Sequence, residues 1–126
     1  MILIFEEEGT VYIAEDVVAV LRQCEGVDVD AGVYRFYDDA GRALKPVFDA
    51  PVKETTLFWR VSSVSSGRYH LEPESASESD PLWLLLHEAI SLQPNPDFDS
   101  LEHVKAYLRQ RGAVVDYPGE AADPPL

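Results

Sequence analysis

VYRFYDDAGRALKPVFDAPVKETTLFWRVSSVSSGRYHLE, residues 33–72, is the segment around which the chain is organised. It predicts two successive β-hairpins, because runs of aromatic and β-branched residues alternate with turn-forming residues. The first hairpin joins 33–38 to 43–48 through the turn DDAG, in which glycine is free to adopt a positive φ. The second hairpin joins 57–63 to 68–72 through the turn VSSG.

Residue parity assigns each side chain of this stretch to one face, because strand side chains alternate between the two faces of a sheet. One parity is apolar and aromatic and is predicted to face the core: Tyr34, Phe36, Leu44, Phe48, Leu57, Trp59, Val61, Tyr69 and Leu71. The other parity is predicted to face outward and gathers cations: Arg35, Lys45, Arg60, Arg68 and His70, mixed with Tyr37, Val47 and Phe58. Pro46 lacks a ladder donor, which predicts an edge strand or a bulge.

The outward parity has two interpretations. It is either a cationic, aromatic-lined patch that binds a carboxylate, a phosphate or an acidic segment of a partner. Or it is an ordinary solvated face, whose cations pair with the surplus acids and keep the strand edges from aggregating. The parity itself depends on the register, because a slip of one residue moves every side chain to the opposite face.

The chain is strongly acidic along its whole length. Its 126 residues include 23 acids and 10 bases, a formal net charge of −13. Residues 1–49 carry 11 acids and 4 bases, and residues 50–126 carry 12 and 6. This balance disfavours nucleic acid and anionic membranes as partners, because both are bound by Lys and Arg. It permits fast association with another protein that is basic, and the alternative is that the acidity serves solubility alone.

The remaining segments predict elements that cover the hairpins. Residues 1–5 predict a short strand buried on both faces, and helical spacing of apolar residues predicts a helix from about 14 to 24. Asp80-Pro81 is a strong start for an apolar helix over 82–92. A further helix follows Asp99, after which residues 113–117 predict a short strand. The segment 27–32 is expected to be a connector.

These elements predict an α+β fold: a mainly antiparallel sheet of four to six strands, with about three helices packed on one face. One globular domain is expected over 1–117, followed by a mobile C-terminal tail over 118–126, which is rich in proline and lacks apolar periodicity. The 82–92 helix is apolar on nearly every side. It is either buried within the monomer or leaves Trp83 and Leu84 for an oligomer interface.

The chain has a single cysteine, so no internal disulfide can form. Cys24 stands at an apolar helical position and is interpreted as a buried thiol. The first residues are too acidic for a secretory signal, and no apolar run approaches the length of a membrane span. We therefore expect a cytoplasmic protein.

No motif in the sequence predicts catalysis, a metal or a cofactor. His87-Glu88 resembles part of a zinc-protease helix, but position 91 is serine where that motif needs a second histidine. His70 and His103 lie on other predicted elements, so nothing in the spacing forces a three-histidine metal site. Asn95-x-Asp97-x-Asp99 lacks the glycine and the later glutamate of a calcium loop and is better explained as a turn.

The leading functional hypothesis is therefore a non-catalytic, small acidic binding protein. Its most concrete form is an inhibitor or immunity-type protein that caps a basic surface of a partner protein. One alternative is a small ligand-binding or enzymatic module that uses the cationic sheet face around Arg35, Lys45, Arg60, Arg68 and His70. Another alternative is a self-associating structural protein that exposes Trp83 and Leu84.

Overall fold

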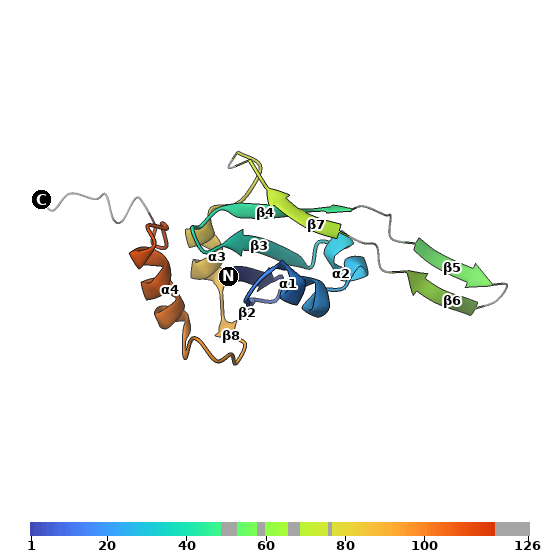
Figure 1. The fold of residues 1–126 in the computed structure, drawn as a ribbon, viewed down its shortest axis with the longest axis horizontal. Coiled ribbons are helices and arrows are strands. Elements are labelled where there is room, and N and C mark those ends of the chain that lie inside the picture. Colours follow the sequence, from blue (N-terminus) through green and yellow to red (C-terminus); the bar gives the residue numbers. More distant parts are fainter. Residues whose placement is uncertain (49–52, 58–59, 66–68, 76, 118–126) are drawn as a thin grey trace, which may run out of the picture.

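A computed structural model describes residues 1–48, 53–57, 60–65, 69–75 and 77–117 of the chain. Within these residues it contains a six-stranded, mostly antiparallel sheet, a separate two-stranded sheet and four helices (Figure 1). The predicted α+β class is confirmed. Among the same residues, no helix is long and apolar enough to cross a membrane.

The strands of the large sheet follow the order β7-β4-β3-β1-β2-β8, and β5 pairs with β6. Every pairing in the large sheet is antiparallel except that between β2 and β8. The strands are β1 Ile2–Glu6, β2 Thr10–Ala14, β3 Tyr34–Asp38, β4 Ala43–Phe48, β5 Lys53–Leu57, β6 Arg60–Ser65, β7 Tyr69–Pro73 and β8 Ser91–Leu92. The helices are α1 Val17–Gln23, α2 Gly26–Asp30, α3 Leu82–Glu88 and α4 Leu101–Gln110.

Strand β1 lies at the centre of the sheet and is buried on both faces, as the sequence predicts. Leu3 and Phe5 face one hydrophobic cluster, which also contains the apolar side chains of α3 and α4. Ile2 and Ile4 face a second cluster, to which α1 and α2 contribute. The predicted placement of all helices on one face is therefore wrong. A strand that is apolar at four consecutive positions, Ile2 to Phe5, requires a cover on both sides, and the four helices divide between the two sides.

The first predicted hairpin is confirmed as β3 and β4. Gly41 has φ 88°, and the Asp38 carboxylate accepts hydrogen bonds from the N–H groups of Ala40 and Arg42, each at 2.9 Å. Phe36 lies opposite Leu44, so the two side chains share one face of the sheet, as the parity predicts. The turn is thus fixed by a glycine that tolerates positive φ and by an aspartate that satisfies the turn amides.

Pro46 interrupts the pairing of β4 with β3. The N–H of Glu74 donates to the carbonyl of Ala43, so Ala43 faces β7, and by alternation Leu44 and Pro46 face β3. The pairing with β3 stops at Leu44. Proline has no N–H to continue it, so β4 is paired on one side only at this point. The prediction of an edge strand is wrong, because β4 lies between β7 and β3.

The prediction of the second hairpin is wrong. Residues 57–63 and 69–72 do not pair with one another, since the hairpin is formed by β5 and β6, and β7 pairs with β4. Tyr69 lies opposite Phe48 with its ring centroid 5.6 Å away, and its hydroxyl donates to the carbonyl of Cys24 at 2.7 Å. The apolar side chains of β7 and β4 therefore lie on the same face of the sheet. Burial of Tyr69 in the core favours this pairing over the predicted one.

Several smaller differences concern segments outside the hairpins. Strands β2 and β8 are not predicted, and α2 occupies part of the expected connector over 27–32. Helix α1 begins only at Val17, where the Asp16 carboxylate caps it by accepting from the N–H of Ala19 at 2.9 Å. Residues 113–117 form no strand. The predicted tail over 118–126 lies outside the described residues.

Candidate functional site

A groove lined by acids lies where the β1–β2 turn meets the C-terminal end of α3. Its volume is about 450 Å³. We call it the acid-lined groove. It is built from the end of β1, the following turn, the start of β3 and the segment around α3. Its lining consists of Phe5, Glu6, Glu7, Glu8, Gly9, Gly32, Val33, Arg35, Asp80, Leu85, Glu88, Ala89 and Ile90.

Gly9 shapes the rim of this groove. Its φ is 101°, a conformation that side chains rarely adopt, and a Cβ added to it would lie 2.9 Å from Cγ1 of Ile90. The Gly9 carbonyl accepts from the N–H groups of Ile90 and Ser91, at 2.8 and 3.3 Å. These bonds draw the chain after α3 against the edge of the sheet, where β8 begins. Only glycine permits both the backbone conformation and the close approach.

The groove carries a net charge of −4 at neutral pH, since it contains five carboxylates and one guanidinium. The guanidinium belongs to Arg35, which forms an ion pair with Asp80 at 3.3 Å. Within the described part of the chain, Glu7, Glu8 and Glu88 make no ion pair. These three carboxylates are therefore available to cations from outside the molecule.

An apolar side chain stands beside these carboxylates. Ile90 is 77% exposed, the largest exposed fraction among the large apolar side chains in the described residues. Leu85 lies deeper in the groove and is 8% exposed. The groove thus combines negative charge with apolar surface, and such a combination suits a basic segment that also offers an apolar contact.

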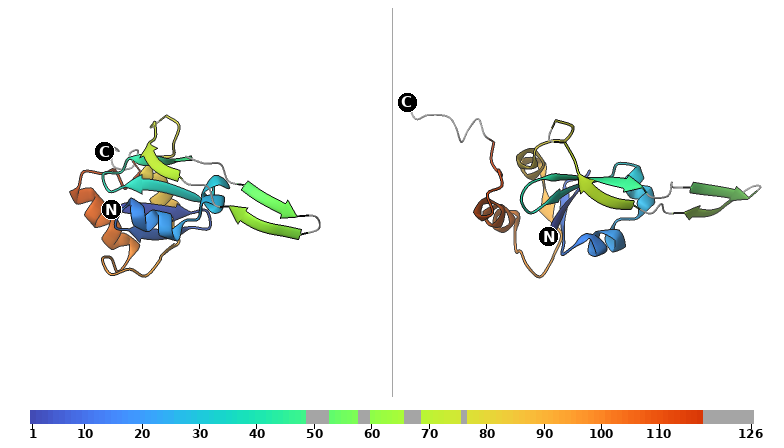
Figure 2. Two further views of the ribbon diagram at one scale, coloured as in Figure 1. Left: turned by 45° about the vertical axis from the view of Figure 1, so that its right-hand side comes forward. Right: turned by 45° about the horizontal axis from the view of Figure 1, so that its top comes forward.

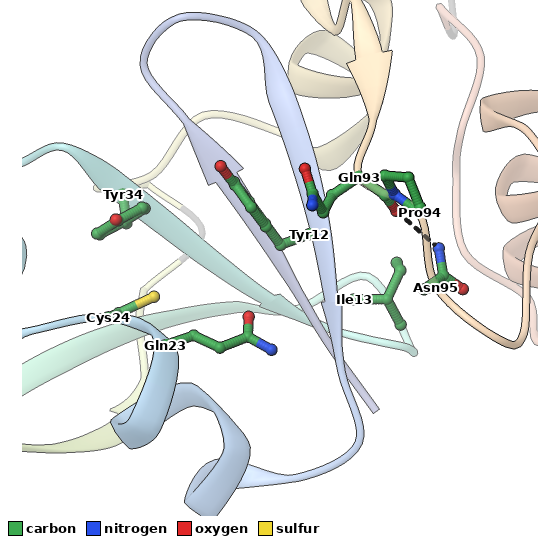
Figure 3. Close-up of a pocket in the computed structure, with 8 residues that line it drawn as sticks. All are labelled: Tyr12, Ile13, Gln23, Cys24, Tyr34, Gln93, Pro94 and Asn95. Atoms are coloured by element: carbon green, nitrogen blue, oxygen red, sulfur yellow. Dashed lines mark hydrogen bonds between the residues drawn. The ribbon is translucent and has the colours of Figure 1, made fainter.

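A second cavity, of about 410 Å³, lies at the edge of β2 on the side of α1 (Figure 3). We call it the neutral pocket, because no charged residue lines it in a chain of net charge −13. The lining residues come from β2, from the C-terminal end of α1, from β3 and from the segment after β8. They are Tyr12, Ile13, Gln23, Cys24, Tyr34, Gln93, Pro94 and Asn95.

The edge of β2 is open beside this pocket. The N–H of Gln93 donates to the carbonyl of Val11 at 2.8 Å, so the polar backbone groups of Val11, and by alternation those of Ile13, point away from β1. The carbonyl of Gln93 is bonded instead to the side-chain amide of Asn95, at 3.0 Å (Figure 3). Pro94 then leads the chain away, which leaves the N–H of Ile13 without a neighbouring strand in the described residues.

The pocket also holds uncommitted hydrogen-bonding groups. Within the described residues, the side-chain amides of Gln23 and Gln93 and the hydroxyl of Tyr34 have no partner. The Tyr12 hydroxyl donates to Glu6 Oε2 at 3.0 Å; this bond, together with burial, raises the pKa of Tyr12. Burial likewise raises the pKa of Tyr34. Both hydroxyls therefore stay neutral at physiological pH.

Cys24 is the one candidate nucleophile in this pocket. It is 2% exposed, and burial raises the pKa of its thiol to about 11. Because the thiolate is the reactive form, this cysteine is inert at neutral pH. The pocket is thus equipped to bind a neutral group by hydrogen bonds and ring contacts, and its side chains offer no activated nucleophile.

The structure separates the residues of the predicted cationic face. Arg35, Lys45 and His70 lie on the same side of the six-stranded sheet, whereas Arg60 belongs to β6 in the other sheet. Arg68 lies outside the described residues. Arg35 pairs with Asp80, and His70 Nε2 with Glu72, which is also the residue opposite Lys45. These three side chains thus each have an acidic neighbour, and their role in binding stays a prediction.

Trp83 and Leu84 are half-buried on α3. The Trp83 ring lies 5.0 Å from the ring of Tyr117. Both residues are less exposed than Ile90, which the sequence places within the predicted 82–92 helix but which follows the end of α3. The role of Trp83 and Leu84 in an oligomer interface stays a prediction.

Among the described residues, no three His, Cys, Asp or Glu side chains are arranged to hold a metal ion. Asn95 Oδ1 accepts from the N–H groups of Asp97 and Phe98, which accounts for the predicted turn. No protein-family model, no curated protein and no solved structure matches this chain.

Proposed function

We propose that this protein is a non-catalytic binding protein that holds a basic segment of a partner protein in the acid-lined groove. One observation carries the proposal: three carboxylates without ion pairs among the described residues, those of Glu7, Glu8 and Glu88, surround a groove whose rim is the 77%-exposed Ile90. Lys and Arg side chains of a partner would pair with the carboxylates, while an apolar neighbour would cover Ile90.

The acidity of the rest of the surface supports the same proposal. Acids outnumber bases in both halves of the chain, so the long-range field attracts a basic partner before the groove is engaged. An inhibitor or immunity-type protein, which caps a basic surface of its target, is the most specific form of this function. We place it in the cytoplasm, because a chain with a single cysteine forms no internal disulfide and suits a reducing compartment.

The test compares two variants that change the net charge equally. Glu7→Gln/Glu8→Gln/Glu88→Gln removes the groove carboxylates, and Glu15→Gln/Glu25→Gln/Asp97→Asn removes three acids elsewhere. Each protein is immobilised, and proteins retained from a native lysate are identified at low and at raised salt. The proposal expects a basic protein that the wild type and the control variant retain and the groove variant loses.

Association and dissociation rates, measured with that purified protein, then distinguish long-range electrostatic attraction from direct contacts in the groove. The groove variant should associate about tenfold more slowly and show a weaker dependence on salt, and Ile90→Ser should mainly accelerate dissociation. If both charge variants bind as tightly as the wild type, or if no basic protein is retained, the proposed function is wrong.

A further inference from the structure

Strand β7 ends the six-stranded sheet and leaves one of its own edges open. It has β4 on one side and no described strand on the other (Figures 1 and 2). The N–H of Glu74 donates to the carbonyl of Ala43, so the backbone groups of Glu74 point towards β4. By alternation, the open edge presents the backbone groups of Tyr69, Leu71 and Pro73. Within the described residues, these groups have no strand to pair with.

The two strands at this end of the sheet are neutral in a strongly acidic chain. With histidine counted as neutral, β4 and β7 carry one positive charge, on Lys45, and one negative charge, on Glu72. The two residues lie opposite each other in the pairing of the strands. The chain as a whole carries −13. A second copy of the chain therefore meets less electrostatic repulsion at this edge than at the acidic surface elsewhere.

The sequence of β7 is complementary to itself when two copies run antiparallel. If Leu71 of one copy lies opposite Leu71 of the other, each His70 lies opposite the other copy's Glu72. An imidazole opposite a carboxylate is a favourable cross-strand pair. A register shifted by two residues would place His70 opposite His70, or Glu72 opposite Glu72, and like charges in directly opposite positions are destabilising. The charges of β7 thus favour the register centred on Leu71.

We propose that two copies of this protein pair through the open edges of β7, antiparallel and centred on Leu71, so that their large sheets become continuous. The two Leu71 residues exchange N–H···O=C bonds, and each Tyr69 N–H donates to the other copy's Pro73 carbonyl. Pro73 has no N–H, so the pairing ends there. Both copies use the same surface, which closes the assembly as a two-fold symmetric dimer. No residue of β7 lines the acid-lined groove, so the dimer does not depend on the proposed function.

The oligomeric state and its dependence on salt test the proposal first. Sedimentation velocity over a range of concentrations should show a dimer for the wild type. Dimerisation should become tighter as salt is raised, because salt screens the repulsion between two acidic chains. Binding of a basic segment in the acid-lined groove should instead weaken with salt, so failure of one proposal is distinguishable from failure of the other. A wild type that stays monomeric up to about 1 mM, at low and at raised salt, overturns the dimer.

Two substitutions of Leu71 separate the main-chain bonds from the side-chain contact. Leu71→Pro removes the N–H at the centre of the pair, whereas Leu71→Ala keeps it, and both shorten the same half-buried side chain. Because this N–H points away from β4, neither variant removes a bond within the sheet. Leu71→Pro should raise the dissociation constant at least about tenfold above that of Leu71→Ala. Equal dissociation constants for the two variants would contradict the proposal.

Disulfide formation between two different chains identifies the register. A chain with His70→Cys is mixed with a chain with Glu72→Cys and oxidised with copper phenanthroline. In the proposed register the two positions face each other with their Cα atoms about 4.5 Å apart, close enough for a disulfide. Cys24 does not compete, because it is buried and its pKa is raised to about 11.

The mixture should yield more disulfide-linked dimer than either variant alone, in which the two cysteines lie diagonally across the pair. Equal yields in the mixture and in the separate variants, or no linked dimer in any sample, would show that β7 does not pair in this way.

Discussion

Replacing Gly9 with alanine should destabilise the protein, and part of that loss should depend on Ile90. Gly9 has φ 101°, and an alanine Cβ there would lie 2.9 and 3.0 Å from Cγ1 and Cδ1 of Ile90. Two separable effects are present: backbone strain, which no neighbour can relieve, and steric overlap, which disappears when the Ile90 side chain is shortened.

The structure sets the size of each effect. A residue other than glycine in a left-handed conformation costs about 1–2 kcal/mol. Relief of the overlap requires Ile90 to leave its preferred rotamer, which costs roughly 0.5–1.5 kcal/mol. Gly9→Ala should therefore lower the free energy of unfolding by about 2–3 kcal/mol, whereas Ile90→Ala, at a side chain that is 77% exposed, should change it by less than about 0.5 kcal/mol.

Urea denaturation of the wild type, both single variants and the double variant forms a complete cycle. Trp83, which lies on α3 directly before this segment, reports unfolding by its fluorescence. The double variant should recover about 1 kcal/mol relative to the sum of the single changes, because only the strain remains. If Gly9→Ala costs the same in the wild-type protein and in the Ile90→Ala variant, the proximity of the two residues does not constrain the groove rim, and our account of it is wrong.

Two further predictions concern buried tyrosines. Burial raises the pKa of Tyr37 to about 12, so the stabilisation from its neutral hydroxyl is complete below about pH 10 and is lost as the pH rises towards 12. The free energy of unfolding, measured by urea titration, should fall over that range, and Tyr37→Phe should make the fall shallower; an unchanged slope would contradict this assignment. Tyr69→Phe leaves the carbonyl of Cys24 without its hydrogen bond and should cost about 1–3 kcal/mol. Tyr107→Phe, whose hydroxyl contacts Asp39 at 3.3 Å, is the control and should cost less than about 0.5 kcal/mol; equal losses in both variants would contradict the importance of the buried bond.

The sequence predicts those parts of the fold in which local pattern and tertiary packing agree. Strand β1 is apolar at consecutive positions, and such a run is stable only at the centre of a sheet. The β3–β4 hairpin has its turn chemistry within four residues, and parity correctly places Phe36 and Leu44 on the same face. Pro46 limits the pairing of β4 with β3 because it has no N–H, but that property alone does not make β4 an edge strand.

The partner of β7 could not be derived in this way. Parity assigns Tyr69 to a face, but it does not say whether the neighbouring strand is the one before it in sequence or an earlier one. Segment 57–63 also alternates, so two pairings satisfy the local pattern equally. The structure selects the pairing that buries Tyr69 against Phe48 and Cys24, and this choice removes Arg60 from the predicted cationic face.

The acid-lined groove exists because a non-local contact overrides a local preference. The apolar run after Asp80-Pro81 favours a helix that continues to residue 92, yet α3 ends at Glu88 and Ala89 is extended, with ψ 136°. The backbone N–H groups of Ile90 and Ser91 bond to the carbonyl of Gly9 instead of to the preceding turn of the helix. A helix that continued through residue 92 would hold Ile90 away from the sheet edge and would separate Glu88 from the glutamates of the β1–β2 turn. The sequence signal for this site is therefore the pair formed by Gly9 and Ile90, which no periodicity within either segment contains.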